Sequence, residues 1–225
     1  MLKSNRLRYV MENIEIIEGL NLLSGFRGCG KTTKTIDIII KSLQMNKQVN
    51  IFSLESKPEI FFYKLVSTYN NIDFPNIVKN PLKYKTEIKQ FKNNKNLYMY
   101  GSYNIFELDD IQRMLLLNKN KNKSRPLVVI DDYNYIGLYS LKEQFKDIPK
   151  NEMESKIIEK FKYISRIYKY DFLLTNTTPK KNIKFDNTYE IKNHKGYFQH
   201  INNHYLYDEN NKRFINITRK WLFRY

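Results

Sequence analysis

Short apolar runs alternate with longer amphipathic stretches along most of this 225-residue chain. The apolar runs have the length of buried strands and lie at 21–24, 48–54, 96–100, 127–130 and 171–176. The stretches between them repeat apolar residues at helical spacing, which predicts helices at 33–45, 58–68, 105–117 and 155–168. This alternation predicts one α/β domain with a mostly parallel, twisted, doubly wound sheet flanked by helices.

The segments outside this alternation predict less regular structure. Residues 69–95 are polar and are interrupted by Pro75 and Pro81, so we expect them to wrap the surface with one weak helix near 84–91. Loops are expected at 118–125 and 138–154.

The two ends of the chain differ in pattern. Residues 1–18 could form a short basic amphipathic helix, which would act as an arm or linker before a domain spanning 19–225. Near the other end, 198–207 and 213–223 alternate in polarity around a turn at 208–212. This pattern predicts a C-terminal β-hairpin.

A glycine-rich loop follows the first predicted strand and opens the first predicted helix. Gly25, Gly30, Lys31 and Thr32 complete the pattern G-x-x-x-x-G-K-[ST] of a phosphate-binding P-loop (Walker A). Such a loop curls backbone N–H groups around phosphates, and its Lys and Thr are expected to reach the β- and γ-phosphates of ATP and a Mg²⁺ ion. The predicted nucleotide-binding residues are Gly25, Phe26, Arg27, Gly28, Cys29, Gly30, Lys31, Thr32 and Thr33.

Polar residues end two of the later strands. Asp131 and Asp132 follow the apolar run LVVI, and Thr175 and Asn176 end DFLLTN. The carboxyl ends of parallel strands converge on one crevice, so we expect these residues beside the P-loop. Asp131 is the predicted Mg²⁺ ligand together with Thr32, while Thr175 and Asn176 could sense the γ-phosphate.

The net charge is +16 and the pI is about 9.6. Self-repulsion of this size favours a polyanionic partner, which points to nucleic acid, although a lysine-rich composition could account for part of it. Residues 178–197 mix lysines with aromatic residues, as expected of a loop over single-stranded DNA. The candidate DNA contacts are Lys180, Lys181 and Lys184.

Several other classes of site find little support. The single cysteine, Cys29, excludes an internal disulfide and a cysteine-based zinc site, and a small packing residue fits its loop position better than a redox switch. His200 and His204 would not share a face at helical spacing on a strand, which argues against a metal site. No long apolar run or signal sequence is visible, so a cytoplasmic protein without membrane contact is expected.

The order of these motifs resembles one family. The segments GLNLLSGFRGCGKTT, VNIFSLES, NLYMYGSYNIFELDDIQ, PLVVIDDYNYI and YKYDFLLTNT together resemble the RecA-like motor domain of DnaB-type replicative helicases over residues 19–220. FSLE after the second strand and the IDxxxxI pattern distinguish this resemblance from a generic P-loop protein. The extra amino-terminal helical domain of that family is not matched, which implies a compact form like those of phages, plasmids or other mobile elements.

The resemblance also implies roles for individual residues. Glu55 corresponds to the glutamate that polarises the attacking water, at the tip of what we expect to be the strand next to the P-loop strand. Asp131 corresponds to the Walker B aspartate, and Asn176 to a polar residue after the sensor strand. Asn134 falls where the family often has glutamine.

The family's activity implies an assembly. It implies an ATP-dependent DNA helicase or translocase that forms a hexameric ring, acts on single-stranded DNA and works with replication proteins. Arg219 or Lys220 would reach the nucleotide of a neighbouring subunit, with Arg224 as the alternative. Three other functions stay open: a DNA-binding ATPase without unwinding activity, such as a loader or recombinase-like factor, a P-loop kinase of a small molecule, and a non-hydrolysing structural subunit.

Overall fold

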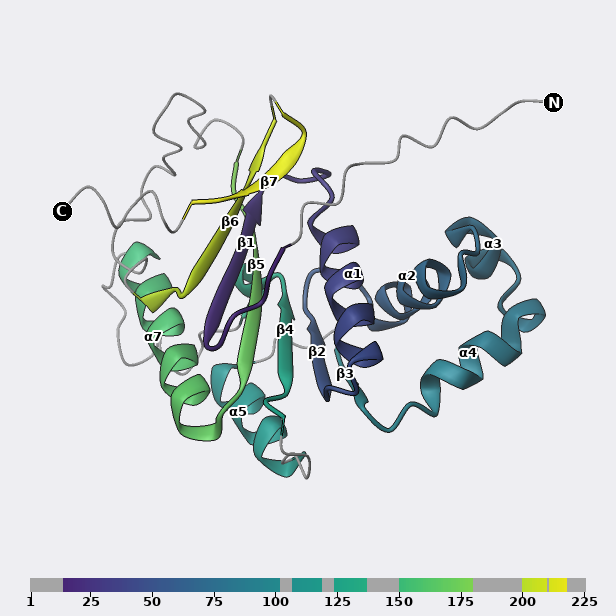
Figure 1. The fold of residues 1–225 in the computed structure, drawn as a ribbon, viewed down its shortest axis with the longest axis horizontal. Coiled ribbons are helices and arrows are strands. Elements are labelled where there is room, and N and C mark those ends of the chain that lie inside the picture. Colours follow the sequence, from purple (N-terminus) through teal and green to yellow (C-terminus); the bar gives the residue numbers. More distant parts are fainter. Residues whose placement is uncertain are drawn as a thin grey trace.

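A computed structural model of the chain describes residues 14–101, 107–118, 124–136, 150–179, 200–209 and 211–217. Its centre is one seven-stranded sheet with the strand order β3-β2-β4-β5-β1-β6-β7 (Figure 1). Neighbouring strands pair in parallel except β6 and β7, which form an antiparallel hairpin. The strands are β1 (Leu20–Gly25), β2 (Val49–Ser53), β3 (Leu97–Tyr100), β4 (Leu127–Asp131), β5 (Asp171–Thr177), β6 (Asn203–Asp208) and β7 (Arg213–Asn216).

Helices cover both faces of this sheet (Figure 1). The helices are α1 (Lys31–Gln44), α2 (Pro58–Asn70), α3 (Phe74–Lys79), α4 (Lys85–Lys92), α5 (Leu108–Leu117) and α7 (Lys150–Tyr168), with short 3₁₀ turns η1 (Pro81–Tyr84) and η2 (Tyr133–Tyr135). Apolar residues of α5 and α7 pack on one face of the sheet. Those of α1, α2, α3 and α4 pack on the other.

The strands themselves are apolar on both sides, as a covered parallel sheet requires. In β4, Val128 and Ile130 face the α5 and α7 layer, whereas Leu127 and Val129 face the α1 and α2 layer. All four side chains are buried. The predicted α/β fold with a mostly parallel sheet and a C-terminal hairpin is confirmed.

Two predictions about secondary structure were wrong. The segment 69–95 contains α3 and η1 in addition to the expected helix, because Pro75 lies in the first turn of α3 and Pro81 begins η1. Proline is tolerated in a first turn, where its missing N–H would have no helical acceptor. The helix α7 begins at Lys150 rather than at 155, whereas the buried apolar residues that mark it in the sequence begin only at Ile157.

The predicted neighbour of the P-loop strand was also wrong. β2 pairs with β3 and β4, whereas β1 pairs with β5 and β6, so β4 and β5 lie between β2 and β1. The chain crosses from β1 to β2 before the strands that will fill the gap have been reached. Sequence order therefore does not reveal which strands become neighbours.

The described part of the N-terminal segment is extended and packs on the sheet. Ile14 and Ile16 lie against the α1 and α2 core. The N–H of Glu15 donates to the hydroxyl of Tyr205 at 3.0 Å, and the side-chain amide of Asn203 donates to the carbonyl of Glu15, also at 3.0 Å. These contacts anchor the segment to β6. The helix predicted for 1–18 falls mostly outside the described residues, and residues 14–17 are not helical.

A buried ion pair ties together the amino ends of the central strands. One carboxylate oxygen of Asp171 accepts from Nε of Arg125 at 2.8 Å and from the N–H of Gly19 at 3.2 Å. The guanidinium of Arg125 also donates to the carbonyl of Tyr170 at 2.9 Å. These bonds join the starts of β1 and β5 to the segment that enters β4.

We expect Asp171→Ala to lower the free energy of unfolding by about 3 kcal/mol, because the substitution leaves the largely buried charge of Arg125 without its buried partner. Urea denaturation of both proteins measures this difference. Glu18→Gln is the matched control, since Glu18 also faces Arg125, at 3.7 Å, but its side chain is 79% exposed. That variant should change stability by less than about 1 kcal/mol, and equal losses in the two variants would contradict the role of Asp171.

Candidate nucleotide site

The P-loop connects the end of β1 to the start of α1 and depends on glycine at three positions. Gly28 and Gly30 have φ angles of +84° and +95°, a backbone conformation that glycine adopts without strain. Gly25 is required for a different reason, because a Cβ there would lie 2.6 Å from Sγ of Cys29 and 3.0 Å from Cβ of Tyr207. The loop is therefore fixed by backbone conformation at its tip and by packing at its base.

The loop offers hydrogen-bond donors to an anion. Among the described residues, the backbone N–H groups of Gly28 and Gly30 have no acceptor, and a Cβ at either position would meet no atom within 4 Å. Nζ of Lys31 donates to the carbonyls of Gly25 and Phe26, each at 3.1 Å. Free donors, open space and a buried ammonium at the positive end of α1 form a cradle suited to phosphate.

A second group of polar residues lies at the carboxyl end of β4. Asp131 is 1% exposed, and one of its carboxylate oxygens accepts from the hydroxyl of Thr175 at 2.7 Å. The carbonyl of Asp131 accepts from the N–H groups of Leu54 and Glu55, at 2.6 and 2.9 Å. Glu55 is thus held beside Asp131 by the backbone, while its side chain is exposed.

The charges of this group influence one another. Burial raises the pKa of Asp131 above its usual value, and the neighbouring carboxylate of Glu55 raises it further. The hydroxyl of Thr175 and the ammonium of Lys31 oppose this by stabilising the ionised form. Lys31, Glu55 and Asp131 therefore belong to one site, although β5 separates β4 from the P-loop strand.

The turn after β4 is linked to the tip of β5. The amide of Asn176 donates to the hydroxyl of Tyr133 at 3.1 Å and accepts from the side-chain amide of Asn134 at 2.8 Å. The carboxylate of Asp132 caps the same turn by accepting from the N–H of Asn134 at 2.9 Å. Burial raises the pKa of Asp132 to about 6. Asn176 thus connects two strand ends, and its predicted role toward the γ-phosphate stays a prediction.

The remaining loop residues have distinct surroundings. Phe26 packs edge-on against Tyr207 of β6, with ring centroids 5.4 Å apart, while Arg27 is exposed. Burial raises the pKa of the Cys29 thiol, which is the opposite of what a reactive cysteine requires. Thr33 is exposed and Thr32 is half-buried in the first turn of α1.

The donor set fits a Mg²⁺ ion, which prefers oxygen ligands and keeps several waters. The buried carboxylate of Asp131 supplies a charged oxygen, and the hydroxyl of Thr32 stands at the start of α1. These two residues would hold the ion. Bound there with a nucleotide, it would neutralise charge on the β- and γ-phosphates.

Other predicted site residues lie outside the described residues. These are Lys180, Lys181, Lys184, Arg219, Lys220 and Arg224. Their roles stay predictions.

The two histidines lie apart in their contacts. Nε2 of His204 lies 2.9 Å from the hydroxyl of Ser24, in the interior, while Nε2 of His200 lies 3.2 Å from the carboxylate of Glu159. Within the described ranges, no group of three or more His, Cys, Asp or Glu residues is arranged to hold a metal ion. No helix in that same part of the chain combines the length and apolar character needed to cross a membrane.

Reasoning from the sequence missed two contacts of the site. It named Thr175 without its hydrogen bond to Asp131, and it named Asn134 and Asn176 without the bond between them. The signal in the sequence was position, because polar residues that end adjacent strands can meet. Using that signal requires the order of the strands, which only the structure provides.

Comparison with solved structures identifies the fold. A solved ATPase domain from a DnaB-like helicase matches with a TM-score of 0.70 at 13% identity, over 86% of this chain and 70% of that chain. A DnaB-like replicative helicase, described with its interactions with primase, matches with a TM-score of 0.70 at 15% identity, over 86% of this chain and 48% of that one. This chain thus spans about half the length of that helicase.

Comparisons based on sequence gave no match, either to a protein-family model or to a curated protein. The structural likeness at this low identity establishes the fold and not the activity. The chain has the RecA-like fold of the ATPase domains of DnaB-like helicases.

Proposed function

We propose that this protein hydrolyses ATP and uses the energy to move along single-stranded DNA as a helicase or translocase. The observation that carries the proposal is the grouping of Lys31, Asp131 and Glu55 beside an anion-binding loop, on a fold shared with helicase ATPase domains. The net charge of +16 supports a nucleic-acid partner.

Each residue has a proposed task. Lys31 leaves the carbonyls of Gly25 and Phe26 and binds the phosphates of ATP, together with the N–H groups of the loop. Thr32 and Asp131 hold Mg²⁺, and Thr175 keeps the Asp131 carboxylate in place. Glu55 orients a water molecule toward the γ-phosphate and accepts its proton.

The assembly follows from the same proposal. Arg219 or Lys220 stabilises the transition state in a neighbouring subunit, which requires an oligomer, and a hexameric ring fits the family resemblance. A residue acting in this way can contribute about 10³–10⁵ in rate. Lys180, Lys181 and Lys184 contact DNA in the channel of the ring.

The test is steady-state ATP hydrolysis at modest salt, with and without single-stranded DNA, on protein whose mass is measured by light scattering. We expect DNA to stimulate hydrolysis in a particle of ring size, and a forked duplex then tests unwinding. Stimulation without strand displacement would assign a DNA-dependent ATPase that does not unwind. Hydrolysis that ignores DNA in a monomeric protein would contradict the proposal and favour a small-molecule kinase.

A further inference from the structure

A helical excursion between β2 and β3 carries much of the positive charge of the chain. Residues 60–95 contain seven lysines and only two acidic residues, Asp73 and Glu87. Figure 1 shows α3 and α4 beyond α2, on the side of the molecule away from α7. The excursion therefore presents its charge on a different part of the surface from the α7 layer.

Six of these lysines are exposed, and their placement is regular. They are Lys79, Lys83, Lys85, Lys89, Lys92 and Lys95. Lys85, Lys89 and Lys92 recur along one side of α4, which turns Phe91 into the core. Within the described residues, no carboxylate lies within 4.0 Å of any of the six, whereas Lys160 and Lys47 elsewhere face Asp109 and Asp171.

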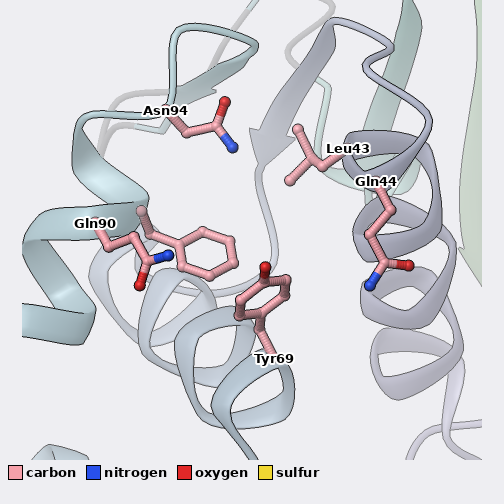
Figure 2. Close-up of a pocket in the computed structure, with 6 residues that line it drawn as sticks. Leu43, Gln44, Tyr69, Gln90 and Asn94 are labelled. Carbon is pink, nitrogen blue, oxygen red and sulfur yellow. The ribbon is translucent and has the colours of Figure 1, made fainter.

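A hollow adjoins this row of lysines. It lies between the carboxyl ends of α1 and α2 and the end of α4, and Figure 2 shows residues from these elements facing one another across it. Its lining consists of Leu43, Gln44, Tyr69, Gln90, Phe91 and Asn94. The volume of about 90 Å³ is well below the roughly 300–1,000 Å³ of pockets that enclose small molecules. The hollow therefore suits part of a ligand that lies mostly on the surface.

The chemistry of the lining narrows the class of ligand. The amides of Gln44 and Gln90 are exposed and have no hydrogen-bond partner among the described residues. Tyr69 is 43% exposed, and its ring stands edge-on to Phe91 with centroids 4.8 Å apart. An amide can donate to and accept from the edge of a nucleobase, and an exposed aromatic ring can stack on its face.

From these observations we infer that α4 and the adjoining hollow form a second nucleic-acid contact, separate from the lysines at 180–184. The lysines of α4 bind the phosphates of a single strand, and the hollow receives the edge of one base. A single strand is favoured over a duplex because its bases are free to enter the hollow. The inference shares with the proposed function only the identity of the nucleic acid, and it does not depend on ATP hydrolysis.

The test is binding of the full-length protein to fluorescently labelled single-stranded DNA, without nucleotide, over a range of salt concentrations. The triple variant Lys85→Gln, Lys89→Gln, Lys92→Gln should bind at least about tenfold more weakly at about 0.1 M salt, with a salt slope smaller by about 2, since each lost contact removes about 0.7. The matched control Lys156→Gln, Lys160→Gln, Arg166→Gln removes three charges from α7, on the opposite face of the sheet. It should bind nearly as the unmodified protein does.

A second variant tests the hollow itself. Gln44→Ala with Gln90→Ala should weaken binding of the single strand about threefold and leave binding of a duplex of equal length unchanged. Equal losses in the α4 and α7 triples would indicate a general charge effect and overturn the inference, as would full affinity in the α4 triple or no binding by the unmodified protein. DNA-independent ATP hydrolysis is measured separately, so failure here and failure of the proposed ATPase are distinguishable.

Discussion

Lys31→Ala is expected to lower kcat/KM for ATP hydrolysis by about 10³-fold, the largest effect of any single substitution in this chain. Nζ of Lys31 is held in the P-loop by the carbonyls of Gly25 and Phe26, on the side of the loop that also faces Asp131. A phosphate entering the cradle would replace those neutral acceptors with charged ones. Hydrogen bonds to charged groups are roughly twice as strong as neutral ones, and they strengthen as charge develops in the transition state.

The measurement is steady-state hydrolysis over a range of ATP concentrations, accompanied by thermal unfolding to verify the fold. Lys41→Ala is the matched control, because Lys41 is exposed in the last turn of the same helix and far along it from the loop. That variant should hydrolyse ATP at the unmodified rate. Turnover within about tenfold of normal in a folded Lys31→Ala protein would place the nucleotide elsewhere.

The P-loop was the most predictable part of the site, because its chemistry lies in consecutive residues. The motif from Gly25 to Thr32 specifies both its conformation and its donors, and the positive φ angles of Gly28 and Gly30 are those that only glycine adopts readily. The helix α1 after it was equally clear from its apolar spacing. Local patterns of this kind need no knowledge of the rest of the fold.

The arrangement around Asp131 was less predictable, because its parts come from three separate strands. The hydroxyl of Thr175 reaches Asp131 from β5, while Glu55 is placed by backbone hydrogen bonds between the end of β2 and β4. These contacts depend on β4 lying between β2 and β5. The sequence indicated that polar residues end these strands, yet it led to the wrong neighbour for β2.

The helical excursion shows a different limit. Prolines at 75 and 81 indicated a broken surface segment, whereas each stands in the first turn of a helix. Ile77 and Phe91 then anchor the excursion to the core formed with α1 and α2. Whether a proline ends one element or begins another depends on such anchoring contacts, which join residues far apart in the chain.

Glu55→Gln should separate ATP binding from hydrolysis. The hydrogen bond from Glu55 to Asp131 is made by its backbone N–H, and its side chain is exposed, so the variant should fold and bind ATP as before. Glutamine cannot accept the proton of the attacking water, and the loss of a general base lowers kcat by about 10²–10⁴-fold. Binding of a fluorescent ATP analogue and single-turnover hydrolysis measure the two steps separately.

Comparison with two other carboxylates makes this result specific. Glu59→Gln changes an acidic residue in the first turn of α2, whose carboxylate accepts from the hydroxyl of Tyr63 at 2.9 Å on the exposed surface, and it should leave kcat unchanged. Asp132→Asn changes a buried carboxyl whose pKa is raised to about 6, a value that would also suit a general base. If Asp132→Asn abolished hydrolysis while Glu55→Gln retained it, Asp132 would be the base. The exposed position of Glu55, beside Asp131 and open to a water molecule, is why we expect the opposite.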